Sequence, residues 1–212
     1  FADSHLIKDG AVIGFKGAAS HPNAVFVRGL TAWVVLENTP SIDAAALKTQ
    51  LGDFAAQVEA SSASGISVLR IGLKKNAPIA AENAGPDLKV TIGANAANPP
   101  GAVAFARNQD DPKRASLTTL LPGATHTLPL TDPVTGDNLI VVAGNTGRAV
   151  PTERDYAEFA ALPTANGLVI TAYADDLSVG VAGGRITITR PGGLSLTPLA
   201  MHEVLGTFAQ AA

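Results

Sequence analysis

The densest cluster of polar side chains in the sequence lies at residues 108–114 (NQDDPKR). Adjacent carboxylates such as Asp110 and Asp111 could assist a glycosidase or hold a hard cation. Neighbours on an extended chain point in opposite directions, however, and the proline in this segment favours a turn. We therefore predict a turn. The functional alternative is a partner-binding loop that contains Asp110 and Asp111 and is flanked by Arg107 and Arg114.

The chain has no cysteine, so a thiolate nucleophile or thiolate metal ligand is excluded, and the histidines are the next residues to consider. The four histidines are far apart in sequence, and no two have the i, i+4 spacing of a helical metal site. We expect no metal and no cofactor. A Ser-His-Asp triad stays open, since its members need not be neighbours in sequence, although no G-x-S-x-G motif occurs. A hydrolase would have to bring one histidine close to Asp110 or Asp111. The histidines are His5, His21, His126 and His202.

The segment Asp132–Asp137 (DPVTGD) loosely resembles a calcium-binding loop. It lacks the alternating oxygen ligands and the terminal glutamate of an EF-hand, so a hairpin turn is the favoured prediction. Two glycine-rich segments, at 183–184 and 192–193, do not predict a phosphate site, because strands rather than a helix N-terminus follow them.

Trp33 is the only tryptophan. It lies in a β-type run between Ala32 and Val34, so we expect a core position. The alternative is an exposed platform on which a sugar ring stacks. Trp33 is therefore the residue that distinguishes a structural module from a glycan-binding one.

The bulk composition excludes some classes of partner. The 212-residue chain carries only 16% charged residues and a net charge of −3, which argues against a nucleic-acid binder with a basic face. No apolar stretch approaches the ~20 residues of a membrane span, so contact with a membrane would be peripheral at most. The low charge has two open explanations: surface covered by partners, or a high alanine content.

The elements that must position these residues are mainly strands. Gly29-Leu30 predicts a tight hairpin between 24–28 and 31–37. Ser41 or Asp43 can cap a short helix over 44–51 that ends at Gly52. Residues 66–73 carry apolar side chains on both faces, so we expect an internal strand. Further strands are predicted at 11–16, 54–60 and 87–92.

After the Asn/Pro-rich segment 94–101, a second run of strands is predicted at 102–107, 116–121, 125–130 and 138–142. The spacing of aromatic residues in 148–162 also allows a short helix. The last third has short strands and glycine turns at regular spacing, which indicates an antiparallel meander. These strands are predicted at 167–172, 177–181, 185–190 and 194–197.

The fold class expected is mainly β, with two small antiparallel β-sandwich or meander units and one or two short helices. We assign residues 1–95 to the first unit, 96–101 to a linker and 102–198 to the second unit. Residues 199–212 are expected to form a helical tail or the start of a further region. Because the chain starts at Phe1, we expect a processed or excised segment.

The first unit resembles an AMIN-type domain, a small β-sandwich of bacterial cell-envelope proteins. The resemblance rests on Phe26–Glu37 (FVRGLTAWVVLE), 43–51, Ser67–Leu73 (SVLRIGL) and Asp87–Gly93 (DLKVTIG). Ala161–Val181 and Gly184–Leu196 are similar to segments of large tetratricopeptide-repeat proteins of alphaproteobacteria. The resemblance implies a periplasmic protein whose domain binds the cell wall or localises a partner complex, and it does not imply catalysis.

We therefore expect a non-catalytic periplasmic module that mediates protein–protein assembly, as a scaffold within a larger envelope complex. The expected partners are envelope proteins, with peptidoglycan as a further possibility and no nucleic acid. The mechanism expected is shape complementarity and pairing at a strand edge. A glycan-binding module and a hydrolase remain as alternatives, and the sequence does not predict an oligomeric state.

Overall fold

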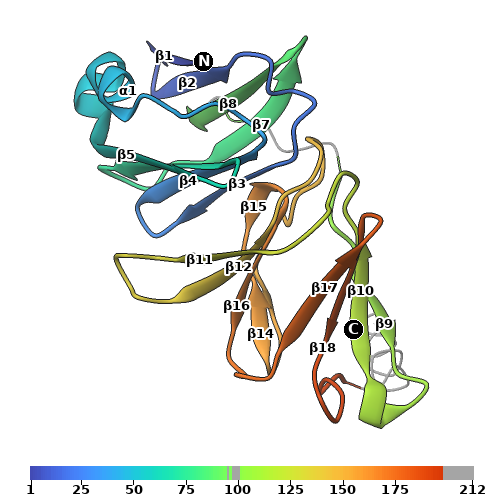
Figure 1. Ribbon diagram of the computed structural model, residues 1–212. Helices are drawn as coiled ribbons and strands as arrows, with labels where there is room; N and C mark the ends of the chain where they lie inside the picture. Colours follow the sequence, from blue (N-terminus) through green and yellow to red (C-terminus); the bar gives the residue numbers. More distant parts are fainter. Residues whose placement is uncertain (95, 97–100, 198–212) are drawn as a thin grey trace, which may run out of the picture.

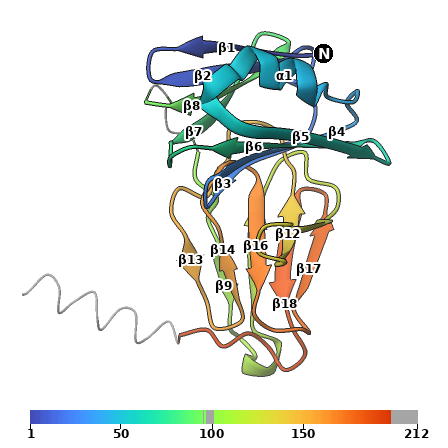
Figure 2. The ribbon, with the colours of Figure 1, turned by 90° about the vertical axis from the view of Figure 1, so that its left-hand side faces the viewer.

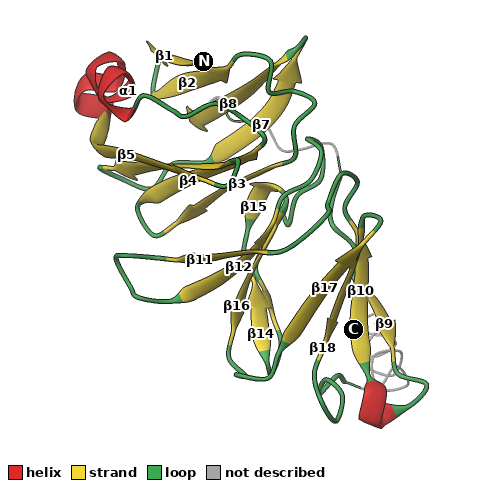
Figure 3. Cartoon of the chain, viewed as in Figure 1, coloured by secondary structure: helices red, strands yellow, loops and turns green. Residues whose placement is uncertain are grey.

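The computed structural model describes residues 1–94, 96 and 101–197 (Figure 1). Strands dominate it, and the one α-helix is short (Figure 3). The strands form four antiparallel sheets of four or five strands each. The predicted fold class is therefore confirmed: mainly β, with small antiparallel β-sandwich units.

The first unit is a sandwich of two sheets, in the upper part of Figure 1. One sheet has the order β1-β2-β8-β7, and the other has the order β15-β3-β4-β6-β5, in which β15 is Thr164–Asn166. Apolar side chains from both sheets and from the helix form one core, in which Ile13, Val34 and Leu47 are fully buried. The bounds of its elements are β1 Ala2–Ile7, β2 Gly10–Phe15, β3 Asn23–Arg28, β4 Thr31–Glu37, α1 Ala44–Leu51, β5 Ala55–Ala63, β6 Ile66–Leu73, β7 Ile79–Ala84 and β8 Asp87–Gly93.

Local sequence signals set the turns of this unit. Gly29 has φ +57 and makes the tight connection between β3 and β4, as predicted. The Asp43 side chain accepts a hydrogen bond from the Ala46 backbone N–H, and Gly52 ends α1. A short 3-10 turn, Gly52–Phe54, follows. β6 is internal, between β4 and β5, as its two apolar faces predict.

The second unit also has two sheets, in the lower part of Figures 1 and 2. The orders are β17-β18-β10-β9 and β11-β12-β16-β14-β13. Their facing side chains form a second core that includes Leu117, Phe159 and Ile188. The bounds are β9 Ala106–Asn108, β10 Ser116–Leu120, β11 Leu128–Thr131, β12 Asn138–Val142, β13 Arg154–Asp155, β14 Phe159–Ala161, β15 Thr164–Asn166, β16 Leu168–Ala172, β17 Ser178–Ala182 and β18 Arg185–Thr189.

One strand crosses the predicted division between the units. β15 follows β14 in the chain, yet it pairs with β3 and completes the β3–β4 sheet of the first unit. A third apolar cluster lies where the units meet and contains Phe26 and Trp33 from one side and Leu139 and Val169 from the other. The two predicted units therefore share β15 and pack against each other through this apolar cluster. We call this contact the seam.

One alternative left open by the sequence does not occur, and two local predictions are wrong. Residues 148–162 form no helix: β13 and β14 lie there, because the segment pairs with itself and with β16. Residues 194–197 form no strand, since the Leu196 N–H bonds to the Leu194 carbonyl in a tight turn. The last third is not a simple meander, because β16 and β17 are consecutive but belong to different sheets.

The predicted helical tail at 199–212 lies outside the described residues. Within the part of the chain that the structure describes, no helix is long and apolar enough to span a bilayer.

Candidate functional site

The polar segment predicted as a turn is one. It connects β9 to β10 and contains the 3-10 turn Pro112–Arg114. The Asp111 carboxylate caps this turn by accepting from the Lys113 backbone N–H at 3.0 Å. It also accepts from Nε of Arg114 at 3.2 Å. Asp111 is therefore engaged in its own turn rather than directed at a ligand.

The other predicted loop residues lie close by but do not converge. Asp110 is exposed, and it borders a shallow surface hollow together with Asn108, Asp111 and Arg114. Arg107 points elsewhere and donates to the Thr197 carbonyl at 3.1 Å. The hollow contains no histidine, so the arrangement predicted for a hydrolase does not form there; His202 lies outside the described residues.

Trp33 is only 2% exposed and belongs to the apolar seam between the two units. Its ring stacks on Phe26 with centroids 5.6 Å apart and an interplanar angle of 9°. The Arg70 guanidinium lies 5.4 Å from the ring centroid. The predicted core position is confirmed. The alternative of a sugar-stacking platform is wrong, because both faces of the ring are covered.

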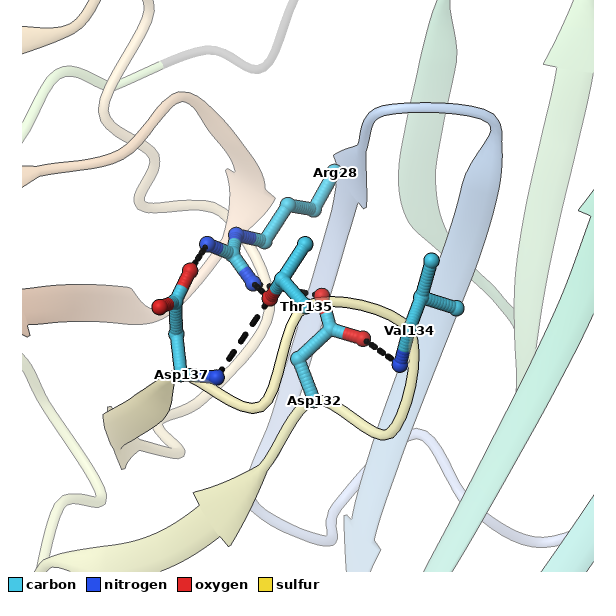
Figure 4. A network of polar contacts seen from close by, with 5 residues as sticks. All are labelled: Arg28, Asp132, Val134, Thr135 and Asp137. Atoms are coloured by element: carbon cyan, nitrogen blue, oxygen red, sulfur yellow. Dashed lines mark hydrogen bonds and ion pairs between the residues drawn. The ribbon is translucent and has the colours of Figure 1, made fainter.

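The main polar constellation of the structure joins two hairpin tips (Figure 4). Arg28, the last residue of β3, reaches the turn between β11 and β12 and pairs with both Asp132 and Asp137. Its Nη1 also donates to Oγ1 of Thr135 at 2.8 Å. The second oxygen of Asp132 accepts from the Val134 backbone N–H at 2.9 Å. We call Arg28, Asp132, Thr135 and Asp137 the arginine clamp.

The clamp shifts the pKa values of Arg28 and Asp137. Burial alone would lower the pKa of the Arg28 guanidinium, but its hydrogen bonds to Asp137 and Asp132 outweigh burial and raise that pKa. The hydrogen bond from Arg28, followed by that from Thr135, lowers the pKa of Asp137. Arg28 and Asp137 are thus both held in their charged forms. The turn predicted at 132–137 is confirmed. The cation that its two carboxylates bind is the guanidinium of Arg28.

A second polar contact crosses the seam beside β4. Glu37 is 4% exposed, and its Oε1 lies 3.8 Å from Nε2 of His126 in the loop before β11. Burial raises the pKa of Glu37, and the nearby His126 offsets part of that rise. His126 is exposed, and its Nδ1 lies 2.7 Å from the Thr125 hydroxyl.

Buried side-chain amides form a hydrogen-bond network across the seam near β15. The Asn166 side chain donates to the backbone carbonyl of Asn23 at 2.9 Å and to that of Gly144 at 3.2 Å. Its Oδ1 accepts from the backbone N–H groups of Gly147 and Arg148. Asn23 and Gly144 also exchange backbone hydrogen bonds. Because every polar atom of the Asn166 amide is satisfied, this network fixes the position of one unit against the other.

The described residues contain no group of three or more His, Cys, Asp or Glu side chains arranged to hold a metal ion. The polar residues that do converge serve the seam between the units. Neither Arg28 nor Asn166 attracts attention in the sequence, because each has partners more than 100 residues away. Of these features, the sequence predicts only the turn at 132–137. It does not predict that Arg28 binds there.

A different kind of site lies at the margin of the second unit. The four sheets are open, so each has two edge strands. Edge strands expose unpaired backbone groups, and charged residues, prolines or burial normally protect them. Seven edges have such protection: Asp3 on β1, Glu59 on β5, Glu82 on β7, Arg107 on β9, Pro129 on β11, Arg154 on β13, and complete burial of β15.

The remaining edge is β17, with the sequence Ser-Val-Gly-Val-Ala. It has neither charge nor proline, and its residues alternate between exposed and half-buried. Among the described residues, its backbone bonds only to β18. We call the outward side of Ser178–Ala182 the β17 edge. It is the candidate functional site, because it offers backbone donors and acceptors to another strand.

Compared with known proteins, the chain matches no family model, no curated protein and no solved structure. The resemblance to AMIN-type domains therefore stays a prediction.

Proposed function

We propose that this chain is a non-catalytic module of the bacterial cell envelope that mediates protein–protein assembly, as a scaffold component of a larger complex. The observation that carries the proposal is the β17 edge. An unprotected edge gives specific backbone hydrogen bonds to an added strand, and the alternating side chains provide selectivity.

The seam between the units supports a scaffold role. A module that positions partners must keep its own surfaces in a fixed relation. Here an apolar cluster, the arginine clamp and the Asn166 network all cross between the units. Association pays less conformational entropy when a surface is already rigid. The polar groups that converge thus hold the two units in a fixed relation, and the exposed β17 edge is available for binding.

The assignment to the cell envelope rests on the resemblance of the first unit to AMIN-type domains. A cysteine-free chain suits an oxidising compartment, where a stray thiol is a hazard. We do not propose glycan binding through Trp33, because this residue is buried and its ring is not accessible to a sugar. The partners we propose are therefore envelope proteins.

Affinity capture of the full-length protein from gently solubilised envelopes tests this function. The informative variant is Gly180→Lys, because a Cβ at Gly180 meets nothing within 4 Å and a charge protects an edge strand. The matched control is Thr187→Lys, since Thr187 faces Gly180 on the neighbouring strand β18. We expect a stoichiometric set of envelope proteins that is retained with the control and lost with Gly180→Lys. A wild-type protein that returns alone, or with wall fragments only, would contradict the proposal.

A further inference from the structure

We propose that a second copy of this chain pairs with the β17 edge in antiparallel orientation about a two-fold axis at Gly180. This inference rests on the proposed function and names the occupant of the same edge. Pairing two copies would join their four-stranded sheets into one continuous sheet.

The sequence of β17 has the symmetry that such pairing requires. A two-fold interface brings residue i against j and residue j against i, so the two facing sequences must be complementary when reversed. Ser178-Val179-Gly180-Val181-Ala182 reads almost the same in both directions. A register centred on Gly180 sets Val179 opposite Val181 of the second copy and Ser178 opposite Ala182. The cross-strand pairs are then valine with valine and small with small.

The direction of the backbone groups supports the same register. β17 and β18 are joined by Gly183-Gly184, whose φ values are +56 and +76, as in a type I′ turn. Residues flanking such a turn exchange hydrogen bonds, so Ala182 and Arg185 are a bonded pair. The alternation along an antiparallel ladder then directs the N–H and C=O groups of Val179 and Val181 outward. The proposed register places these outward groups opposite each other.

The side chains and charges around the edge fit a second copy. Val179 and Val181 pack on the core of the second unit but remain half-buried, so the facing valines would cover their exposed parts. Asp175, just before β17, and Arg185, just after the turn, are both exposed. Antiparallel pairing brings the acidic start of one β17 toward the basic end of the other hairpin. The contact is therefore complementary in charge as well as in shape.

The area of this contact predicts a weak dimer. A pair of five-residue strands lies at the low end of specific interfaces, so we expect a Kd of about 10 µM to 1 mM. Sedimentation velocity of the purified chain across that range should show a reversible dimer. Gly180→Lys sets two like charges directly opposite and should weaken it by about tenfold or more. Thr187→Lys adds the same charge one strand away from the edge and should leave the dimer unchanged.

Two further variants separate a lost interface from a lost fold. An equal mixture of Gly180→Lys and Gly180→Glu should recover the dimer, because opposite charges then face each other. Gly180→Cys places the only thiols of the cysteine-free chain at a non-hydrogen-bonded pair, whose Cα separation of about 4.5 Å suits a disulfide. Mild oxidation should link this variant at least about tenfold faster than the Thr187→Cys control.

A chain that stays monomeric at 1 mM, or a Gly180→Lys variant that dimerises like the wild type, would overturn the second-copy inference. The proposed function fails separately. If the purified chain is monomeric while Gly180→Lys still abolishes capture of envelope proteins, the edge serves a different partner and the assembly role stands.

Discussion

Arg28 and Asp132 are 104 residues apart in the sequence, yet their side chains form an ion pair that joins the β3–β4 hairpin to the β11–β12 hairpin. The side chains are 20% and 6% exposed, so this pair is much less accessible to solvent than an ordinary surface ion pair. Because Asp132 also caps its own turn, the contact fixes both the conformation of one hairpin and its position against the other.

Replacing Arg28 with methionine should therefore destabilise the fold. The change keeps the aliphatic packing but leaves Asp132 buried without its cation, which we expect to cost about 2–3 kcal/mol in the free energy of unfolding. Urea denaturation measures the change. Lys89→Met is the control, since Lys89 pairs with Glu82 at the surface and should matter by less than about 1 kcal/mol. Equal effects of the two variants would contradict the assigned role of the clamp.

The clamp should also give the fold a specific sensitivity to acid. Its hydrogen bonds hold the pKa of Asp137 below the value of about 3.9 expected in the unfolded chain. A carboxylate with a lowered pKa in the folded state stabilises above its unfolded pKa, and that stabilisation is lost as the pH falls through its folded pKa. The stability gap between wild type and Arg28→Met should be constant from pH 5 to 7 and narrow below about pH 4. A gap that stays constant down to pH 2 would contradict this.

Trp33 should report directly on the seam between the units. As the only tryptophan, buried against Phe26, it should emit at short wavelength and resist quenching by acrylamide. Trp33→Ala leaves a large cavity and should cost about 3–5 kcal/mol, whereas Trp33→Phe keeps an aromatic ring and should cost less. Quenching in the native state at the rate of free tryptophan would show that the seam opens in solution.

The loop between β9 and β10 provides a test of structure against binding. Asp111→Ala removes a cap and should destabilise by about 1 kcal/mol, while Asp110→Ala should change stability by less than about 0.5 kcal/mol. Thermal unfolding of both variants measures this. If Asp110→Ala instead abolishes capture of an envelope protein while the β17 variants do not, the binding site lies on this loop.

Short-range signals made much of the fold predictable. The Gly29 hairpin, the Asp43 cap and the alternation of Leu88, Val90 and Ile92 each depend on residues close in sequence. β15 could not be predicted in the same way, because its buried residues pair with β3, about 140 residues earlier. The spacing of Tyr156 and Phe159 is compatible with one face of a helix. In the structure, however, the two rings stack on each other across the turn between β13 and β14.

The candidate site was predictable in its parts but not in its arrangement. The sequence marks 177–181 as a strand and Gly183-Gly184 as a turn, yet it does not say which strand lies at an edge. That depends on β16 and β17 joining different sheets, which is decided by packing between distant segments. For the same reason, Asp110 and Asp111 attract attention as neighbours, whereas Arg28 does not, although the clamp contains the stronger electrostatic contacts.

Assembly through the β17 edge can be tested by photo-crosslinking in living cells, with a photoreactive amino acid at position 180 of the full-length protein and, as control, at position 187. Position 180 lies on the β17 edge with open space around it, and position 187 lies one strand inward. We predict a strong adduct from position 180, of a mass that identifies a second copy of the chain, and little from position 187. No adduct from position 180, or equal adducts from both positions, would contradict assembly through the β17 edge.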